Sequence, residues 1–204
     1  MKKLVTEIDV INLIRSGSRV LIVEDGYIFT PLALDKIKEK KITVVNKSKT
    51  KNSNIIRIAI GSDHTGYTVK LLLIEYLQAK NYVVEDVGTF SEESCDYPDF
   101  AIAVAKKVLL ENVNFGILID ATGIPSAITA NKFPGIRATT CYDEFSVKSA
   151  REHNNANILV LGAKTLNEEK IKLLVDIWLT TEFAGERHQK RIDKIIELEK
   201  KILK

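Results

Sequence analysis

The 204-residue chain has few of the residues that build disulfide frameworks or metal centres, with two cysteines and three histidines. Cys95 and Cys141 form no metal-ligand spacing, and such sparse cysteine fits a reducing compartment. The chain also lacks an apolar run near the ~20 residues that a membrane-spanning helix needs. Its opening MKKLVTEIDV has Glu7 and Asp9 where a secretory signal would have an apolar core. These absences predict a cytoplasmic protein without a structural metal or a membrane span.

The composition is that of a globular protein, with 45% hydrophobic and 28% charged residues, which excludes wholesale disorder and collagen. The length allows one domain plus an appendage. The net charge of +3 is uneven, because residues 1–54 contain 11 Lys/Arg against 6 Asp/Glu. Part of this excess is Lys47, Lys49 and Lys51, in a polar stretch without aromatic residues. We therefore expect a solvated linker there and no nucleic-acid partner.

Residues 1–45 are predicted to form a small α+β unit, and the polar run NKSKTKNSN at 46–54 is predicted to be a linker. Thr6 with Asp9 resembles an N-cap pair before a first helix, and Thr30 followed by Pro31 marks the start of a second. The other signals are a helix end at Gly17, a strand over 20–23, a turn at Gly26 and a strand over 42–45. So short a unit buries little surface by itself, so we expect it to pack on something larger.

Residues 55–204 are predicted to form an α/β domain, because apolar strand patterns alternate with helical ones. The strands are expected at 55–60, 82–87, 115–119, 136–140 and 157–161, and the helices at 68–80, 100–110, 127–132, 144–152 and 168–179. The run FGILI at 115–119 is typical of a strand buried on both faces. This order indicates a Rossmann-like three-layer sandwich with a five-stranded parallel sheet. The amphipathic stretch 187–204 is predicted to be a dimerisation helix.

A ligand site is expected beyond the carboxyl ends of the strands, where open parallel sheets bind their ligands. Polar residues follow three of the predicted strands, at 61–66 (GSDHTG), 96–98 (DYP) and 120–123 (DATG). Two histidines, His64 and His153, are expected near this edge. Together these groups supply a carboxylate, an anion-binding helix start and an acid/base imidazole, which indicates a small phosphorylated substrate and proton transfer.

Other features are ambiguous when taken singly. The 61–66 segment is not the G-x-G-x-x-G fingerprint of dinucleotide-binding proteins. The third histidine, His188, lies between Arg187 and Arg191, and this group is either an anion clamp or a solvated helix face.

Five segments carry a more specific signal: IAIGSDHTGYTVK, EDVGTFSEESCDYPDFA, GILIDATGIPSAITANKFPGIRATTC, SAREHNNANILVLGAK and GERHQKRID. In order and spacing they resemble the ribose-5-phosphate isomerase type B / galactose-6-phosphate isomerase family over about residues 56–195. The resemblance implies a Rossmann-like fold, no metal or other cofactor, and homodimers or larger assemblies with active sites shared between subunits. It also implies interconversion of aldose and ketose phosphates through a cis-enediolate. The segment VLIVEDGYIFTPLALDKIKEKKI loosely resembles N-terminal segments of proteins linked to bacterial microcompartments.

The resemblance also implies roles for individual residues. His153 matches the histidine that opens the sugar ring, with help from Asp63, and Asn154 matches a contact to a sugar hydroxyl. Thr122 and Gly123 match a loop whose backbone donors stabilise the enediolate oxygen. The matches to the phosphate and pocket contacts are His64, Tyr97, Arg187 and Arg191, with His188 among them. Lys164 stands where many members have arginine, so it keeps the charge without the bidentate fork.

Asp120 departs from the family pattern. Many members have at this position a cysteine that moves the proton between two carbons, and others use a glutamate a few residues along, where this chain has Ser126. Three interpretations stay open: a substitute base, a cap of the following helix aided by Thr122 and Pro125, or half of a mixed site completed by another gene product. The third has a precedent, because one subunit of the galactose-6-phosphate branch has Ile-Asp-Ala here. Pro125 also replaces a loop glycine, which removes one backbone N–H.

The sequence therefore predicts a sugar-phosphate aldose–ketose isomerase that converts ribose 5-phosphate to ribulose 5-phosphate, with Asp120 as the group that moves the proton. One alternative is activity of the galactose-6-phosphate isomerase type. The other is a non-catalytic sugar-phosphate-binding protein in which Asp120 has displaced the usual base. A homodimer and a homotetramer are both compatible with the sequence.

Overall fold

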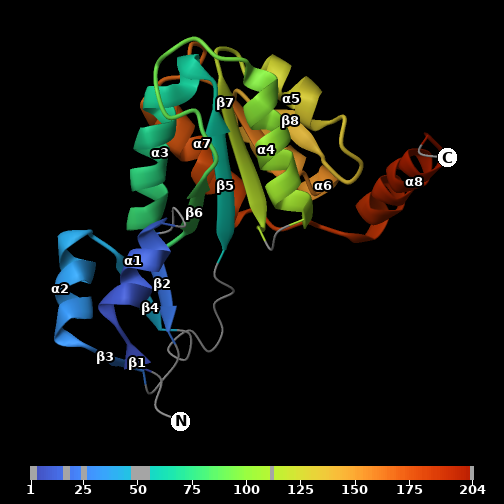
Figure 1. Ribbon diagram of the computed structural model, residues 1–204. Coiled ribbons are helices and arrows are strands. Elements are labelled where there is room, and N and C mark those ends of the chain that lie inside the picture. Colours follow the sequence, from blue (N-terminus) through green and yellow to red (C-terminus); the bar gives the residue numbers. More distant parts are fainter. Residues whose placement is uncertain (1–3, 16–18, 24–26, 47–55, 111–112, 203–204) are drawn as a thin grey trace. The chain divides into compact units, whose positions relative to one another are not determined.

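The computed structural model describes residues 4–15, 19–23, 27–46, 56–110 and 113–202 (Figure 1). The chain divides into two compact units, Met1–Ile55 and Ile56–Lys204. The predicted helix end at Gly17, the predicted turn at Gly26 and all of the predicted linker except Asn46 lie outside the described residues.

The first unit consists of two short parallel sheets and two helices. Its elements are β1 (Leu4–Val5), α1 (Glu7–Arg15), β2 (Val20–Val23), β3 (Ile28–Phe29), α2 (Pro31–Glu39) and β4 (Thr43–Asn46), with β1 paired to β3 and β2 to β4. Both predicted helix starts are confirmed. The Asp9 carboxylate accepts hydrogen bonds from the Thr6 backbone N–H at 2.8 Å and from its hydroxyl at 2.7 Å, and the Thr30 hydroxyl accepts one from the Ala33 N–H at 3.2 Å. β1 and β3 were not predicted, because two residues show no periodicity.

The second unit confirms the predicted Rossmann-like fold, because it has one five-stranded parallel sheet with strand order β6-β5-β7-β9-β8. The strands are β5 (Arg57–Ser62), β6 (Val83–Asp86), β7 (Phe115–Asp120), β8 (Ala138–Thr140) and β9 (Ile158–Gly162). The helices are the short 3₁₀ turn η1 (His64–Gly66), α3 (Tyr67–Ala79), α4 (Tyr97–Leu110), α5 (Ile124–Ala130), α6 (Glu144–Asn154), α7 (Glu168–Thr180) and α8 (Glu186–Ile202).

Helices cover both faces of this sheet, so its strands are buried on both sides (Figure 1). Within β7, Ile117 and Ile119 pack with α3, α6 and α7, whereas Leu118 packs with α4 and α5 on the other face. This is the alternation that a pleated strand imposes on successive side chains. It explains why FGILI is apolar throughout rather than at every second residue.

The chain order of the strands creates a switch point between β5 and β7. After β5 the chain adds β6 on one side and then crosses to place β7 on the other. Ser62 is paired with Ile119, and the Asp63 N–H donates to the Ile119 carbonyl at 3.2 Å. The residues that follow β5 and those that end β7 are therefore neighbours at the carboxyl edge, which is where such folds bind ligands.

Candidate active site

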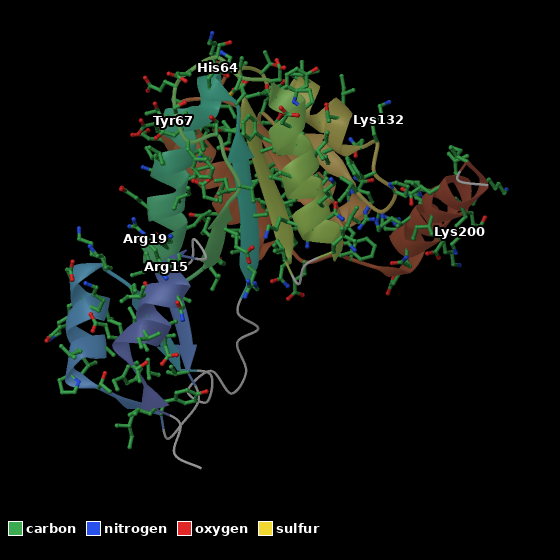
Figure 2. The ribbon with its side chains drawn as sticks, in the orientation of Figure 1. Arg15, Arg19, His64, Tyr67, Lys132 and Lys200 are labelled. Carbon is green, nitrogen blue, oxygen red and sulfur yellow. The ribbon has the colours of Figure 1, made fainter. Side chains whose placement is uncertain are left out.

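Seven of the predicted site residues lie at the carboxyl edge of the sheet and form what we call the strand-end cluster: Asp63, His64, Tyr97, Asp120, Thr122, Gly123 and Lys164. Figure 2 shows His64 at this end of the second unit. Tyr97 was expected to precede a helix over residues 100–110, but it is the first residue of α4. Lys164 follows β9, and its N–H donates to the Ala121 carbonyl at 3.0 Å, which brings it beside the loop after β7.

Asp63 is nearly buried and caps the 3₁₀ turn that carries His64. Its Oδ1 accepts from the Thr65 N–H at 2.9 Å, the Thr65 hydroxyl at 2.6 Å and the Gly66 N–H at 3.2 Å. The turn approaches β7 so closely that a Cβ at Gly66 would lie 2.6 Å from the Ile119 carbonyl oxygen. Glycine is therefore required here.

His64 has a partner that the sequence analysis did not assign to the site. The Cys95 N–H donates to His64 Nδ1 at 3.3 Å, and the Cys95 thiol lies 3.9 Å from the same nitrogen. Because Nδ1 accepts, the ring proton of the neutral imidazole is on Nε2. His64 is half-buried and can offer Nε2–H as a donor to a phosphate oxygen. Nothing in the spacing of Cys95 indicates this contact.

Asp120 accepts hydrogen bonds from the loop that follows it. Its Oδ1 accepts from the Thr122 N–H at 2.9 Å and from the Gly123 N–H, and its Oδ2 accepts from the Ser126 N–H at 3.0 Å. The residue is 1% exposed. The backbone donors that were expected to face an enediolate oxygen are thus bound to Asp120. Of the three interpretations of Asp120, these contacts favour the helix cap.

The other predicted residues form a second group, the helix-end cluster: His153, Asn154, Arg187, His188 and Arg191. The rings of His153 and His188 are stacked with their centroids 4.4 Å apart, and His153 Nδ1 lies 3.2 Å from the Ser149 hydroxyl. Arg187 Nε donates to His188 Nε2 at 3.3 Å. Arg191 lies one turn further along α8 and is exposed, so the two guanidinium groups lie on one side of that helix.

The helix-end cluster contains several positively charged groups, which act on the histidine among them. Burial lowers the pKa of His188, and the nearby His153, Arg187 and Arg191 lower it further, against the opposing effect of Glu152. Two more arginines hold the turn after His153. Arg137 donates to the carbonyls of Asn154 and Asn155, and Arg151 donates to the Ala156 carbonyl at 2.6 Å. Sequence reasoning assigned neither arginine to the site, because contacts to backbone carbonyls leave no motif.

The expectation that His153 lies at the carboxyl edge is wrong. α6 runs back against the direction of the strands, so its last turn, which carries His153, lies beside the start of β9. Asp120 pairs instead with Gly162, at the end of β9. The two edges are separated by the length of that strand, about 13 Å at ~3.3 Å per residue. A single chain therefore does not bring the two clusters together. The error arose because polarity next to a strand does not distinguish its start from its end.

No group of three or more His, Cys, Asp or Glu side chains that could hold a metal ion occurs among the described residues. Within the same ranges, no helix combines the length and the apolar character needed to cross a membrane.

A doubly wound sheet that carries capping carboxylates, imidazoles and clustered guanidinium groups has the groups expected of an enzyme that acts on small anionic molecules. The family model Ribose/Galactose Isomerase matches residues 58–195, and the chain belongs to this family. Ribose-5-phosphate isomerase B of Escherichia coli (strain K12) is 40% identical over 145 residues, which cover 71% of this chain and 97% of that protein.

Solved structures of ribose-5-phosphate isomerases B are similar to this chain in both fold and sequence. Ribose-5-phosphate isomerase B of Clostridium thermocellum is 45% identical with a TM-score of 0.71, covering 72% of this chain and 99% of that one. The Mycoplasma genitalium enzyme with bound ribulose-5-phosphate is 41% identical with a TM-score of 0.68, covering 71% and 97%. The chain is therefore a sugar-phosphate isomerase of the aldose–ketose type. Residues 1–57 lie outside the family match.

Proposed function

We propose that this chain interconverts ribose 5-phosphate and ribulose 5-phosphate. One observation carries the proposal: the solved structure of the relative from Mycoplasma genitalium contains bound ribulose-5-phosphate. That relative is 41% identical to this chain, and the match covers 97% of the relative. The helix-end cluster supplies groups that this substrate needs, because the imidazole of His153 stacks on His188, and His188 in turn accepts a hydrogen bond from the Arg187 guanidinium group.

His153 is the proposed ring-opening residue. Its Nδ1 lies against the Ser149 hydroxyl, so Nε2 is the nitrogen left to exchange a proton with the sugar. Opening moves the proton of the anomeric hydroxyl to the ring oxygen and leaves a carbonyl at carbon 1. Isomerisation then removes the proton from carbon 2 and returns a proton to carbon 1, while the proton of the hydroxyl at carbon 2 moves to the carbonyl oxygen at carbon 1. Carbon 2 thereby becomes the new carbonyl and carbon 1 carries the new hydroxyl.

The phosphate of the substrate is the proposed ligand of Arg187 and Arg191, with His64 Nε2–H and the Lys164 ammonium completing the contacts. Guanidinium groups suit this role because their parallel N–H groups bind phosphate oxygens in pairs. His64 and Lys164 belong to the strand-end cluster, whereas the arginines belong to the helix-end cluster.

We infer from this division that each active site combines the strand-end cluster of one chain with the helix-end cluster of another. The inference is supported by the separation of His153 from Asp120 along β9. α8 also leaves Ile195, Leu198 and Ile202 exposed, which is an apolar face that a second chain can cover. The assembly would be a homodimer, or a homotetramer built from such dimers.

The direct test is nuclear magnetic resonance of the full chain in deuterium oxide with ribose 5-phosphate, ribulose 5-phosphate or galactose 6-phosphate. We expect interconversion of the two pentose phosphates and entry of solvent deuterium at carbon 2. Exclusive turnover of galactose 6-phosphate would overturn the choice of substrate. Saturable binding in a thermal-shift titration without exchange on any sugar would instead indicate a binding protein. His153→Ala is the matched variant, and it should impair turnover of the cyclic sugar more than that of an open-chain analogue.

A further inference from the structure

In the segment 122–126, which leads from the end of β7 into α5, every backbone N–H already has a partner within the chain. Within residues 122–126, all of which are described, the donors of Thr122, Gly123 and Ser126 are bound to the Asp120 carboxylate. The Ile124 N–H donates to the Thr122 hydroxyl at 3.3 Å, and Pro125 has no N–H. The carboxylate of this chain thus occupies the place that an external anion would take.

Two carbonyl groups of the same loop also accept hydrogen bonds from side chains. The Thr140 hydroxyl donates to the Gly123 carbonyl at 2.7 Å, and the Tyr142 hydroxyl donates to the Thr122 carbonyl at 2.9 Å. Gly123 has a φ of +81°, and a Cβ there would meet the Thr140 methyl group at 2.7 Å. The loop is therefore fixed from both sides, and rotation of Asp120 toward a substrate would leave three N–H groups to find new partners.

Asp63 gives an independent comparison within the same chain. It follows the neighbouring strand, is 8% exposed, and uses one carboxylate oxygen to accept from the N–H groups two and three residues later. Asp120 Oδ1 accepts from the N–H groups at the same two offsets. Two aspartates at adjacent strand ends thus make the same capping contacts, and Asp120 adds a third contact to Ser126.

A base that removes a proton from carbon needs an accessible lone pair directed at that carbon. The carboxylate of Asp120 has about four lone-pair positions, of which three accept backbone N–H groups. With 1% exposure, the residue presents almost no surface to a substrate.

We propose that Asp120 is a positioning residue: its carboxylate is the internal anion that holds the 121–126 loop in shape, and another group moves the proton between carbons 1 and 2. The proposal rests on the proposed isomerase function for the identity of the reaction. Its structural part, the capping role, stands apart from the substrate.

The test compares Asp120→Ser, Asp120→Asn and Asp120→Ala in the full chain. Serine keeps a cap acceptor within reach of the Thr122 and Gly123 N–H groups but has no carboxylate. We expect Asp120→Ser to fold, to exceed Asp120→Ala in Tm, and to keep deuterium exchange at carbon 2 within about tenfold of the wild type. Loss of a true base would cost about 10²–10⁴-fold.

The outcomes separate this proposal from the proposed function. A folded Asp120→Ser that binds ribose 5-phosphate like the wild type but loses exchange by about a hundredfold or more overturns the positioning role. If Asp120→Ser does not fold, Asp120→Asn gives the same comparison, because its side-chain oxygen still faces the Thr122 and Gly123 N–H groups. An Asp120→Ala variant with the Tm of the wild type also overturns it. A wild-type chain that isomerises no sugar refutes the proposed function, and the order of the three Tm values still tests the cap.

Discussion

The imidazole rings of His153 and His188 lie face to face, with 4.4 Å between their centroids and 7° between their planes. His188 is 6% exposed, and its Nδ1 is buried without a hydrogen-bond partner among the described residues. Because its Nε2 accepts from Arg187, His188 is neutral in this arrangement and supports the ring of His153 without adding charge.

The buried His188 makes the free energy of unfolding depend on pH. The pKa of His188 is lowered in the folded chain by burial and by the positive charges around it. In the unfolded chain it returns to about 6.5, so the unfolded state binds more protons below that pH. The free energy of unfolding should therefore fall as the pH drops below about 6.5, whereas above that pH His188 is neutral in both states and adds no pH dependence.

Urea unfolding at pH 7.5 and pH 5.5 measures this effect in the wild type and in His188→Phe, which keeps an aromatic ring but does not titrate. We expect a smaller difference between the two pH values in the variant. An equal difference in both proteins would show that His188 is not the titrating group.

His64 should contact phosphate through Nε2, because its Nδ1 accepts from the Cys95 N–H. In His64→Asn the side-chain oxygen can replace Nδ1 but no donor reaches the position of Nε2, whereas His64→Gln extends an amide N–H toward that position. Since a hydrogen bond to a charged group contributes about 1.5–3 kcal/mol, we expect KM for ribose 5-phosphate to rise about tenfold or more in His64→Asn. The rise in His64→Gln should be smaller, with kcat little changed in both. A fall in kcat with unchanged KM in both variants would place His64 in the chemical step instead.

Lys70 is expected to be a major contributor to the stability of the carboxyl edge. Its ammonium is fully buried, binds the Asp86 carboxylate at 2.6 and 2.7 Å, and donates to the Thr89 carbonyl at 2.6 Å. Lys70→Met would leave the Asp86 carboxylate without its cation and the Thr89 carbonyl without its donor. Because 26% of the Asp86 side chain is exposed to water, we expect a cost below the about 3–5 kcal/mol of a fully buried pair. Denaturant unfolding of Lys70→Met, Asp86→Asn and the double variant gives the coupling energy. Destabilisation by Lys70→Met of less than about 0.5 kcal/mol, the size of an ordinary surface change, would contradict this role.

Much of the fold could be predicted from the sequence because its elements depend on local patterns. The strand β7 was predicted from FGILI, and the helix starts at Thr30 and Thr6 from capping chemistry, since both signals lie within a few residues. The element ends were less accurate. The helix expected from Phe100 begins at Tyr97, because the proline in Asp-Tyr-Pro fits the first helical turn as well as a loop.

The positions of the site residues could be predicted from the sequence only where the order and direction of the strands fix them. Asp63 and Asp120 are neighbours because parallel strands end at one edge, but which groups the Asp120 carboxylate contacts depends on its rotamer. The contacts of Tyr142 and Thr140 to the loop, and of Cys95 to His64, join segments distant in sequence through backbone atoms, so no residue pattern predicts them.

The division of the site between two edges of one sheet leads to a complementation prediction. His153→Ala disables the helix-end cluster, and the double variant His64→Ala with Lys164→Ala disables the phosphate contacts of the strand-end cluster. If each site takes one cluster from each of two chains, a mixed dimer of these variants has one intact site and one doubly disabled site. Random pairing of equal amounts makes half of the dimers mixed, so refolding the two together should restore about a quarter of wild-type activity at subsaturating ribose 5-phosphate. Each variant refolded alone is the control. If the mixture stays as inactive as its components at every ratio, while size measurements show that mixed oligomers form, both clusters of a site must come from the same chain.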